Sequence, residues 1–238
     1  SGDRRVKAFW NLLSEHGIAS DTIGWWATWP AEQVLGMIVA PTWSPGTGVK
    51  YGWVAEGASG TVWPAELEAE VFETVARQAE AVDEEKRAIF GAPPADLSRK
   101  GVRQWEETNW AFRTDSTNAE VLRRRIESGA ASRVLAVYLG GADVTGHRFW
   151  AALNPEVFGL APDHEVVRAF AHVIPAYYEY VDRLIGELVE LLPADSTLLV
   201  ISDHGMREID LVEDELDLYG VTGSHADLEN PAFFLPAG

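Results

Sequence analysis

The chain has 238 residues, of which 47% are hydrophobic and 24% charged, as expected of a globular α/β chain with a buried core. Its net charge of −18 argues against nucleic-acid binding, because phosphate backbones are held by Lys and Arg patches, and against docking on an anionic membrane. It has no cysteine, which excludes disulfides, thiolate metal sites and cysteine nucleophiles. Any metal site must therefore use His, Asp or Glu.

The composition leaves the cellular compartment open, because a cysteine-free chain is stable in either redox environment. No apolar run approaches the roughly 20 residues needed to span a bilayer. The first residues, Ser1-Gly2-Asp3-Arg4-Arg5, do not resemble a signal peptide. Localisation is therefore not predicted.

The first 40 residues predict one helix and two short strands. The helix covers residues 6–16, with Asp3 as its cap and Gly17 as its stop. The apolar stretches at 22–26 and 37–40 are typical of strands. A helix and short strands at the start favour a mixed α/β fold.

A loop is expected from Pro41 to Trp63, where glycine, proline and aromatic residues show no period. Four glycines in it resemble a phosphate cradle only superficially, since no Gly-Lys-Ser/Thr follows. They are Gly46, Gly48, Gly52 and Gly60. We therefore interpret this stretch as a plain loop.

Two helices are expected after this loop, at 66–89 and 118–127. The second contains Arg123-Arg124-Arg125, which on a helix is usually a solvated face, with substrate binding as the alternative.

The second half predicts buried strands at 133–139, 197–202 and 232–235. A long helix at 163–192, bent by Pro175, lies between the first two. Buried strands alternating with helices indicate an α/β fold with a mainly parallel sheet and helices on both faces.

Residues that can bind metal cluster beside these strands. Asp143 and His147 follow the strand at 133–139, Asp203 and His204 follow the strand at 197–202, and His225 precedes the last strand. Ligands of open α/β sheets bind at the carboxyl ends of strands, where the first two clusters fall. If the chain turns helical after Gly141, Asp143 and His147 can share an ion, and a carboxylate–imidazole set suits zinc, manganese or iron(II).

Three blocks carry a family resemblance: Asp143-x-x-x-His147-x-Phe149-Trp150, then Asp203-His204-Gly205-Met206, then Gly223-x-His225. Together they resemble the type I phosphodiesterase and nucleotide pyrophosphatase branch of the alkaline phosphatase superfamily. The segments 6–13 and 24–32 resemble bacterial members of that branch. The resemblance spans about residues 5–238 and is loose over 41–118.

The resemblance implies a hydrolase of phosphodiesters or phosphomonoesters with two divalent metal ions, zinc first and manganese as the alternative. One ion would be held by Asp143, His147 and His225. The other would be held by Asp203 and His204 with a further Asp and a nucleophilic Ser or Thr.

The further Asp and the nucleophile normally lie upstream, and no matching segment precedes Val6. We therefore expect residues 1–238 to be a single alkaline phosphatase-like domain truncated at both ends, with an insert at about 41–118. The nucleophile would come from outside this chain, and the chain alone would be inactive. An incomplete sheet edge would favour self-association. Hydroxyls near the motifs do not match the nucleophile's setting; they are Thr28, Thr145, Ser202, Thr222 and Ser224.

Two rival functions stay open. A Ser-His-Asp hydrolase would use Ser224 with His204 or His225, but no Gly-x-Ser-x-Gly elbow exists to expose a serine. A degenerate domain that binds metal without catalysis is the other. Phosphodiester, phosphomonoester, sulfate and phosphonate substrates are not distinguished by the sequence.

The remaining histidines and the tryptophans are interpreted as structural. His16 ends the first helix, where a partly positive ring suits the dipole, and His164 and His172 lie on or near the long helix. The tryptophans are expected in the core, with a wall of the substrate pocket as the alternative reading; they include Trp25, Trp26 and Trp29.

Overall fold

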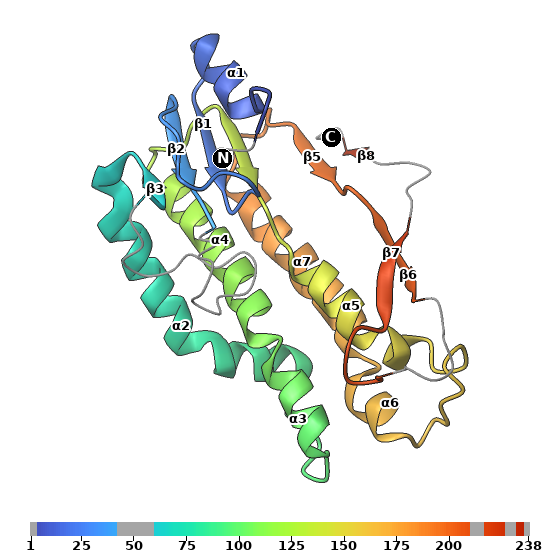
Figure 1. Ribbon diagram of the computed structural model, residues 1–238. Helices are drawn as coiled ribbons and strands as arrows, with labels where there is room; N and C mark the ends of the chain where they lie inside the picture. Colours follow the sequence, from blue (N-terminus) through green and yellow to red (C-terminus); the bar gives the residue numbers. More distant parts are fainter. Residues whose placement is uncertain (1–3, 42–59, 210–216, 227–231, 236–238) are drawn as a thin grey trace. The chain divides into compact units, whose positions relative to one another are not determined.

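The structure, a computed structural model, describes residues 4–41, 60–209, 217–226 and 232–235 (Figure 1). The chain divides into two compact units. Unit 1 comprises Ser1–Asp83 and Trp110–Gly140, and unit 2 comprises Glu84–Asn109 and Gly141–Gly238. That the chain is a single domain stays a prediction.

Unit 1 contains a four-stranded sheet in the order β3-β2-β1-β4. β1 pairs in parallel with β2 and β4, and the two-residue β3 adds an antiparallel edge. The strands are β1 (Ser20–Ile23), β2 (Gly36–Val39), β3 (Val62–Trp63) and β4 (Val134–Val137). The predicted mixed α/β fold with a mostly parallel sheet is confirmed.

Helices cover both faces of this sheet. Ile38 packs with Trp10 of α1 (Phe9–Glu15) in one apolar cluster. Met37, the preceding residue of β2, points to the opposite face, where it lines a small cavity together with Val71 of α2 (Glu68–Phe90) and Val121 of α4 (Asn109–Glu127). This alternation follows from the two-residue period of a strand. The predicted helices on both faces are therefore found in unit 1.

α1 begins later than the predicted residue 6, and Asp3, its expected cap, lies outside the described residues. Asn11 serves instead, because its Oδ1 accepts from the amide of Ala8 at 3.0 Å. Three glycines of the predicted loop, Gly46, Gly48 and Gly52, also lie outside the described residues.

β1 ends at Ile23 rather than at the predicted residue 26, because Gly24 has a φ of +73°. A side chain at this glycine would also overlap the Asn118 amide, whose Nδ2 donates to the carbonyl of Tyr138 at 3.0 Å. Residues 25 and 26 therefore leave the sheet.

Two long helices accompany the sheet: α2 (Glu68–Phe90), which follows a short 3-10 turn at Ala65–Leu67, and α4 (Asn109–Glu127). α4 begins nine residues before the predicted start, 109 against 118. The sequence gives no apolar period over this part of α4, because its buried residues are polar. They are Thr114, Asp115, Ser116, Thr117 and Asn118. Asp115 accepts from the amide of Gly140 at 2.8 Å.

The three consecutive arginines of α4 are ion-paired. Arg123 and Arg124 both contact Glu120 at 2.7 Å. The Nε of Arg125 lies 3.5 Å from Asp21, which is buried in β1. The predicted solvated face is therefore wrong for Arg125, which turns toward the sheet.

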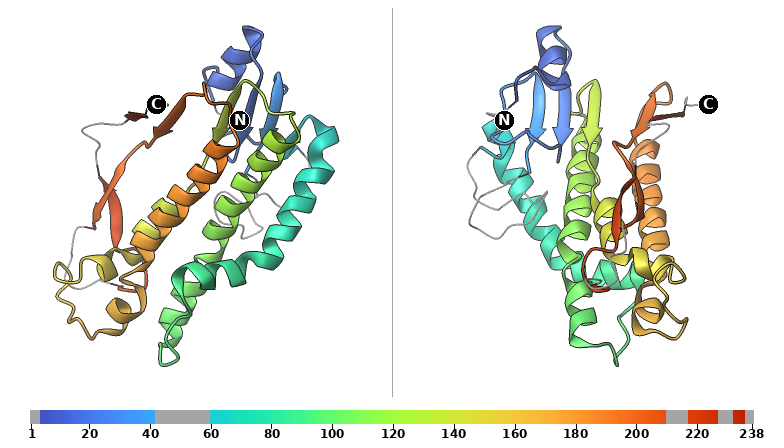
Figure 2. Two further views of the ribbon diagram at one scale, coloured as in Figure 1. Left: turned by 180° about the vertical axis from the view of Figure 1, so that it is seen from behind. Right: turned by 45° about the vertical axis from the view of Figure 1, so that its right-hand side comes forward.

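In unit 2, the helices are α3 (Arg99–Glu106), α5 (Gly141–Leu153), α6 (Glu165–Phe170) and α7 (Val173–Glu190). α5 and α7 lie side by side (Figure 2). Their core includes Phe149, Phe170 and Tyr177, all at most 1% exposed.

The predicted single helix at 163–192 is wrong, because the chain breaks at Ala171 and His172. In an unbroken helix, Pro175 would clash with the carbonyl of Ala171 and leave it without an amide donor. In α7, Pro175 falls in the first turn, where no amide donor is required. The proline therefore separates two helices instead of bending one.

The strands of unit 2 form two antiparallel pairs, β5 (Leu198–Ile201) with β8 (Ala232–Leu235) and β6 (Gly205–Glu208) with β7 (Gly223–Ala226). The prediction that β5 is buried is wrong, since Leu199, Val200 and Ile201 are 49%, 38% and 53% exposed. A two-stranded pair cannot cover both of its faces by itself.

The structural reading of the histidines agrees with their contacts. His16 caps α1, His164 caps α6, and His172 contacts the carbonyl of Phe90 at 2.6 Å. The expectation that the tryptophans are core is wrong for Trp26 and Trp29, which are 52% and 40% exposed.

Among the helices that the structure describes, none is long and apolar enough to cross a membrane.

Candidate metal centre

α5 places two of the predicted ligands on one side of a helix. It begins at Gly141, four residues after β4 ends, so Asp143 falls in its first turn and His147 one turn later. Residues four apart lie on the same face of a helix. The Oδ1 of Asp143 and the Nε2 of His147 are 3.4 Å apart.

The β6–β7 pair brings the other two imidazoles to the same place. His204 directly precedes β6, and His225 lies in β7 opposite Met206. The two rings stack, with centroids 3.6 Å apart and planes at 20°. The His225 Nε2 also lies 2.9 Å from the His147 Nε2. Three separate segments of unit 2 therefore supply one cluster.

The Oδ1 atom of Asp143 is the centre of this cluster. It lies 3.4 Å from the Nε2 of His225 and 3.6 Å from that of His204, besides the contact with His147. The ligating atoms of Asp143, His147 and His225 all lie within 4.8 Å of one another. Nevertheless, Oδ1 is buried and accepts no hydrogen bond.

Backbone carbonyls fix the tautomer of two rings. The Nδ1 of His147 lies 2.8 Å from the carbonyl oxygen of Gly223, and that of His204 lies 3.0 Å from the carbonyl oxygen of Gly205. A carbonyl can only accept, so each Nδ1 must carry the proton. In the neutral rings, each Nε2 then carries a lone pair, and both Nε2 atoms lie within 3.6 Å of the Asp143 Oδ1.

These groups fit a divalent cation. A buried carboxylate oxygen without a donor, facing imidazole lone pairs, is an acceptor set that costs free energy unless a cation or a proton enters it. Nitrogen and oxygen ligands in this number suit zinc. The histidine–carbonyl hydrogen bonds are also the usual support of metal-binding imidazoles. The role of the five predicted residues as ligands stays a prediction.

Asp203 is placed differently from the other four residues. Its Oδ1 lies 3.7 Å from the Nε2 of His204, but its side chain is 92% exposed. Asp203 therefore lies near the cluster, because it directly precedes His204, but its carboxylate remains exposed to solvent.

Two residues beside the cluster were not identified from the sequence as part of it. Gly223 packs on the backbone of α5 so closely that a side chain there would overlap the carbonyl of Gly146. Thr222, fully buried, bonds to α5 through its amide and hydroxyl. The Gly-x-His motif contains Gly223, whereas Thr222 was noted from the sequence only as a hydroxyl near the motifs and not as a contact of α5.

The hydroxyls near the motifs make backbone contacts. Thr145 donates to the carbonyl of Gly141, Ser202 to that of His204 and Thr28 to that of Trp25. Within the described residues, no hydrogen bond links a serine or threonine hydroxyl to an imidazole. The contact pattern therefore gives no support to a Ser-His-Asp site, and the nucleophile stays unassigned.

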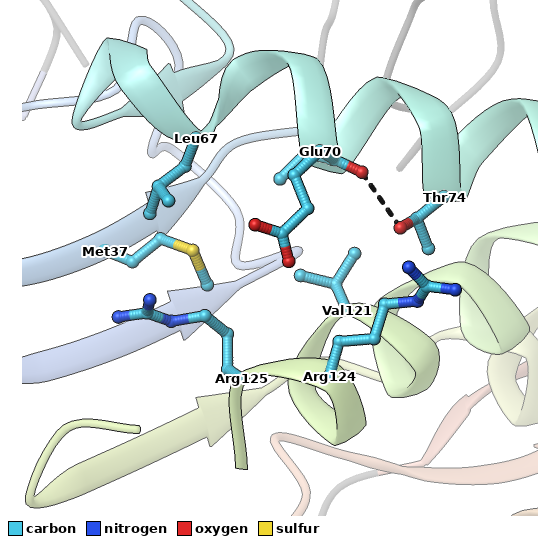
Figure 3. A pocket seen from close by; sticks show the side chains of 8 residues that line it. Met37, Leu67, Glu70, Thr74, Val121, Arg124 and Arg125 are labelled. Carbon is cyan, nitrogen blue, oxygen red and sulfur yellow. Dashed lines mark hydrogen bonds between the residues drawn. The ribbon is translucent and has the colours of Figure 1, made fainter. Parts of the chain in front are cut away.

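One cavity in unit 1 is too small to hold a substrate. It lies between β2, α2 and α4 and has a volume of about 10 Å³, room for one water molecule at most (Figure 3). Its lining consists of Met37, Leu67, Glu70, Val71, Thr74, Val121, Arg124 and Arg125.

The family model described as Type I phosphodiesterase / nucleotide pyrophosphatase matches residues 3–222. The match includes Asp143, His147, Asp203 and His204 and ends three residues before His225. Comparisons with curated proteins and with solved structures found no match.

Proposed function

This chain belongs to the type I phosphodiesterase / nucleotide pyrophosphatase family, a branch of the alkaline phosphatase superfamily, and on that premise we propose that it is a metal-dependent phosphoester hydrolase. The family is generally hydrolytic, and its members act on phosphodiester or pyrophosphate bonds with metal ions. The metal ligands of this chain would be Asp143, His147, His204 and His225, with Asp203 at the exposed edge.

The observation that carries the proposal is the buried Oδ1 of Asp143, which has three imidazole Nε2 atoms within 3.6 Å and no hydrogen bond. Such a group of acceptors is stabilised by a divalent cation. The chain has a net charge of −18, so it repels a phosphoester unless bound cations reverse the local field.

The stacking of His204 on His225 favours two ions rather than one. Each Nε2 lone pair lies in the plane of its ring, and two nearly parallel planes with ring centroids 3.6 Å apart do not bring both lone pairs to a single point. Two-metal hydrolases hold their ions about 3.5–4 Å apart. We assign His225 to the ion of Asp143 and His147, and His204 with Asp203 to the other.

The bound ions would supply Lewis-acid stabilisation of the phosphoryl oxygens and lower the pKa of the attacking group. The residues of the chain itself orient the imidazoles. Gly223 and Gly205 hold the Nδ1 protons of His147 and His204, which keeps both Nε2 atoms free to bind. Zinc is our first choice of metal and manganese the second.

The test is hydrolysis by the chain as it stands, loaded with zinc or manganese, of a bis-aryl phosphate diester, an aryl phosphate monoester and an aryl sulfate. Hydrolysis of the diester that a chelator abolishes and added metal restores would support the proposal, and it would show that the nucleophile expected from outside lies within this chain. His225→Ala should lose this hydrolysis, whereas His16→Ala, which removes an exposed imidazole from α1, should not. Activity that survives exhaustive chelation would refute the proposal.

The second candidate is a domain that binds metal without catalysis. It is favoured by the 92% exposure of Asp203, which leaves the second ion with one enclosed protein ligand. Metal binding by calorimetry without turnover of any of the three esters would support it, and turnover would exclude it.

A further inference from the structure

Thr222 contacts α5 at two points of one helical turn. Its backbone amide donates to the carbonyl of His147 at 2.8 Å. Its Oγ1 accepts from the amide of Ala151 at 3.1 Å. Thr222 is fully buried, so water does not compete for either bond.

The two bonded groups of α5 are normally partners of each other. In an α-helix, the amide of residue 151 donates to the carbonyl of residue 147. Thr222 supplies an acceptor to the amide of Ala151 and a donor to the carbonyl of His147, and thereby bridges this position of the helix. The residue directly before β7 is therefore hydrogen-bonded to the backbone of His147 itself and not to a neighbouring side chain.

The next residue acts on the imidazole of the same histidine. The carbonyl of Gly223 accepts from the Nδ1 of His147, and Gly223 rests against the carbonyl of Gly146 without room for a side chain. Two residues later, His225 brings its Nε2 to 2.9 Å from that of His147. The backbone of His147, its ring and its neighbouring ligand are thus all set by residues 222–225.

We propose that Thr222 is a positioning residue of the metal centre, which fixes the backbone of His147 so that Gly223 can hold the Nδ1–H tautomer. The proposal rests on the proposed metal-binding function. Without Oγ1, the segment before β7 loses one of its two hydrogen bonds to this turn of α5. β7 then moves away from α5, and the His147 ring loses its fixed orientation.

The test compares Thr222→Val, which keeps the shape but removes the acceptor, with Thr222→Ser, which keeps the acceptor. Cobalt(II) is titrated into each chain and followed by its visible absorption. Loss of a residue that orients a metal ligand weakens binding about 10–100-fold, and we expect Thr222→Val to fall in this range. We expect Thr222→Ser to stay within about threefold of the parent, because its hydroxyl serves the same amide.

Nitrogen NMR of the ring of His147 in the metal-free chains is the second measurement. The parent and Thr222→Ser should show the Nδ1–H tautomer, and Thr222→Val a mixture. If Thr222→Val does not fold, Thr222→Ala takes its place with the same expectation. If neither variant folds, Thr222→Ser is the test: retained cobalt affinity and an unchanged tautomer of His147 support the proposal, and loss of either refutes it.

The outcomes separate this proposal from the proposed function. A parent that binds no cobalt refutes metal binding, and the NMR comparison then still tests the positioning of His147. A Thr222→Val chain that binds like the parent and keeps the tautomer refutes the role of Thr222 alone. Equal weakening in the valine and serine variants would also refute it, since shape rather than the hydroxyl would then matter.

Discussion

Asp143 and Asp203 meet different surroundings, although both lie beside His204. Asp143 has a buried Oδ1 with three imidazole Nε2 atoms around it, whereas the carboxylate of Asp203 is open to solvent. Burial strengthens the attraction between a carboxylate and a cation, and solvent screens it. The two carboxylates should therefore contribute unequally to metal affinity.

The first prediction compares His225→Ala with Asp203→Ala in calorimetric zinc titrations. His225→Ala should reduce the affinity of the tighter site more than about a hundredfold, because it removes a direct ligand. Asp203→Ala should reduce it less than about threefold. Thermal denaturation of both metal-free variants controls for folding. Equal losses would contradict the assignment of the two residues to different ions.

At the scale of elements, one carboxylate, that of Glu32, accepts hydrogen bonds from α1 and from the residue Arg4 before it. Glu32 accepts from Arg4 at 2.6 Å, from the Trp10 indole at 3.0 Å and from the Asn11 amide at 2.8 Å. Burial raises the pKa of Glu32, but these hydrogen bonds and the charge of Arg4 outweigh it and lower the pKa to about 2. The ionised form is therefore bound more tightly in the folded chain.

We predict that Glu32→Gln lowers the free energy of unfolding at pH 7 by on the order of 2 kcal/mol. Because the folded pKa of about 2 lies below the ordinary value of 4.5, the contribution is full above pH 4.5. It is lost as the pH falls toward 2. Urea unfolding from pH 7 to pH 2 measures this, with the exposed Glu80→Gln as control. A difference between Glu32→Gln and the parent that does not shrink in acid would contradict it.

The elements that the sequence predicted well are those whose signal is local. The apolar runs of β1, β2 and β4 are contiguous, and their positions were predicted to within a few residues. α4 was missed over nine residues because its buried residues 114–118 are polar and give no apolar period. Two of them have partners in another segment, Asp115 with the Gly140 amide and Asn118 with the Tyr138 carbonyl. Such partners are distant in sequence, so no local sequence pattern predicts them.

The same distinction applies to the candidate site. Asp143 and His147 could be paired from their spacing, since four residues make one helical turn. Their meeting with His225 was expected only from the family resemblance. The stacking of His204 on His225 and the bonds from Thr222 to α5 depend on how β7 packs against the helix. Tertiary packing of this kind has no signature in a single sequence.

At the scale of the whole molecule, strand β5 combines exposed apolar residues with an unpaired edge. Among the described residues it pairs only with β8. Leu199 and Ile201, two apart and so on one face, are 49% and 53% exposed, and Val200 on the other is 38% exposed. An exposed apolar strand with an open edge pairs readily with another chain. The net charge of −18 opposes this through repulsion between copies.

We therefore predict that the chain self-associates and that salt strengthens the association, because the Debye length shrinks from about 30 Å at 0.01 M to about 8 Å at 0.15 M. Light scattering across protein concentration and salt measures the mean mass. Leu199→Lys with Ile201→Lys should leave a monomer under all conditions, since both charges fall on the exposed apolar face. Val157→Lys, a 42% exposed valine outside the strands, is the matched control and should associate like the parent. A parent chain that stays monomeric at every salt concentration would show that β5 is not a self-association edge.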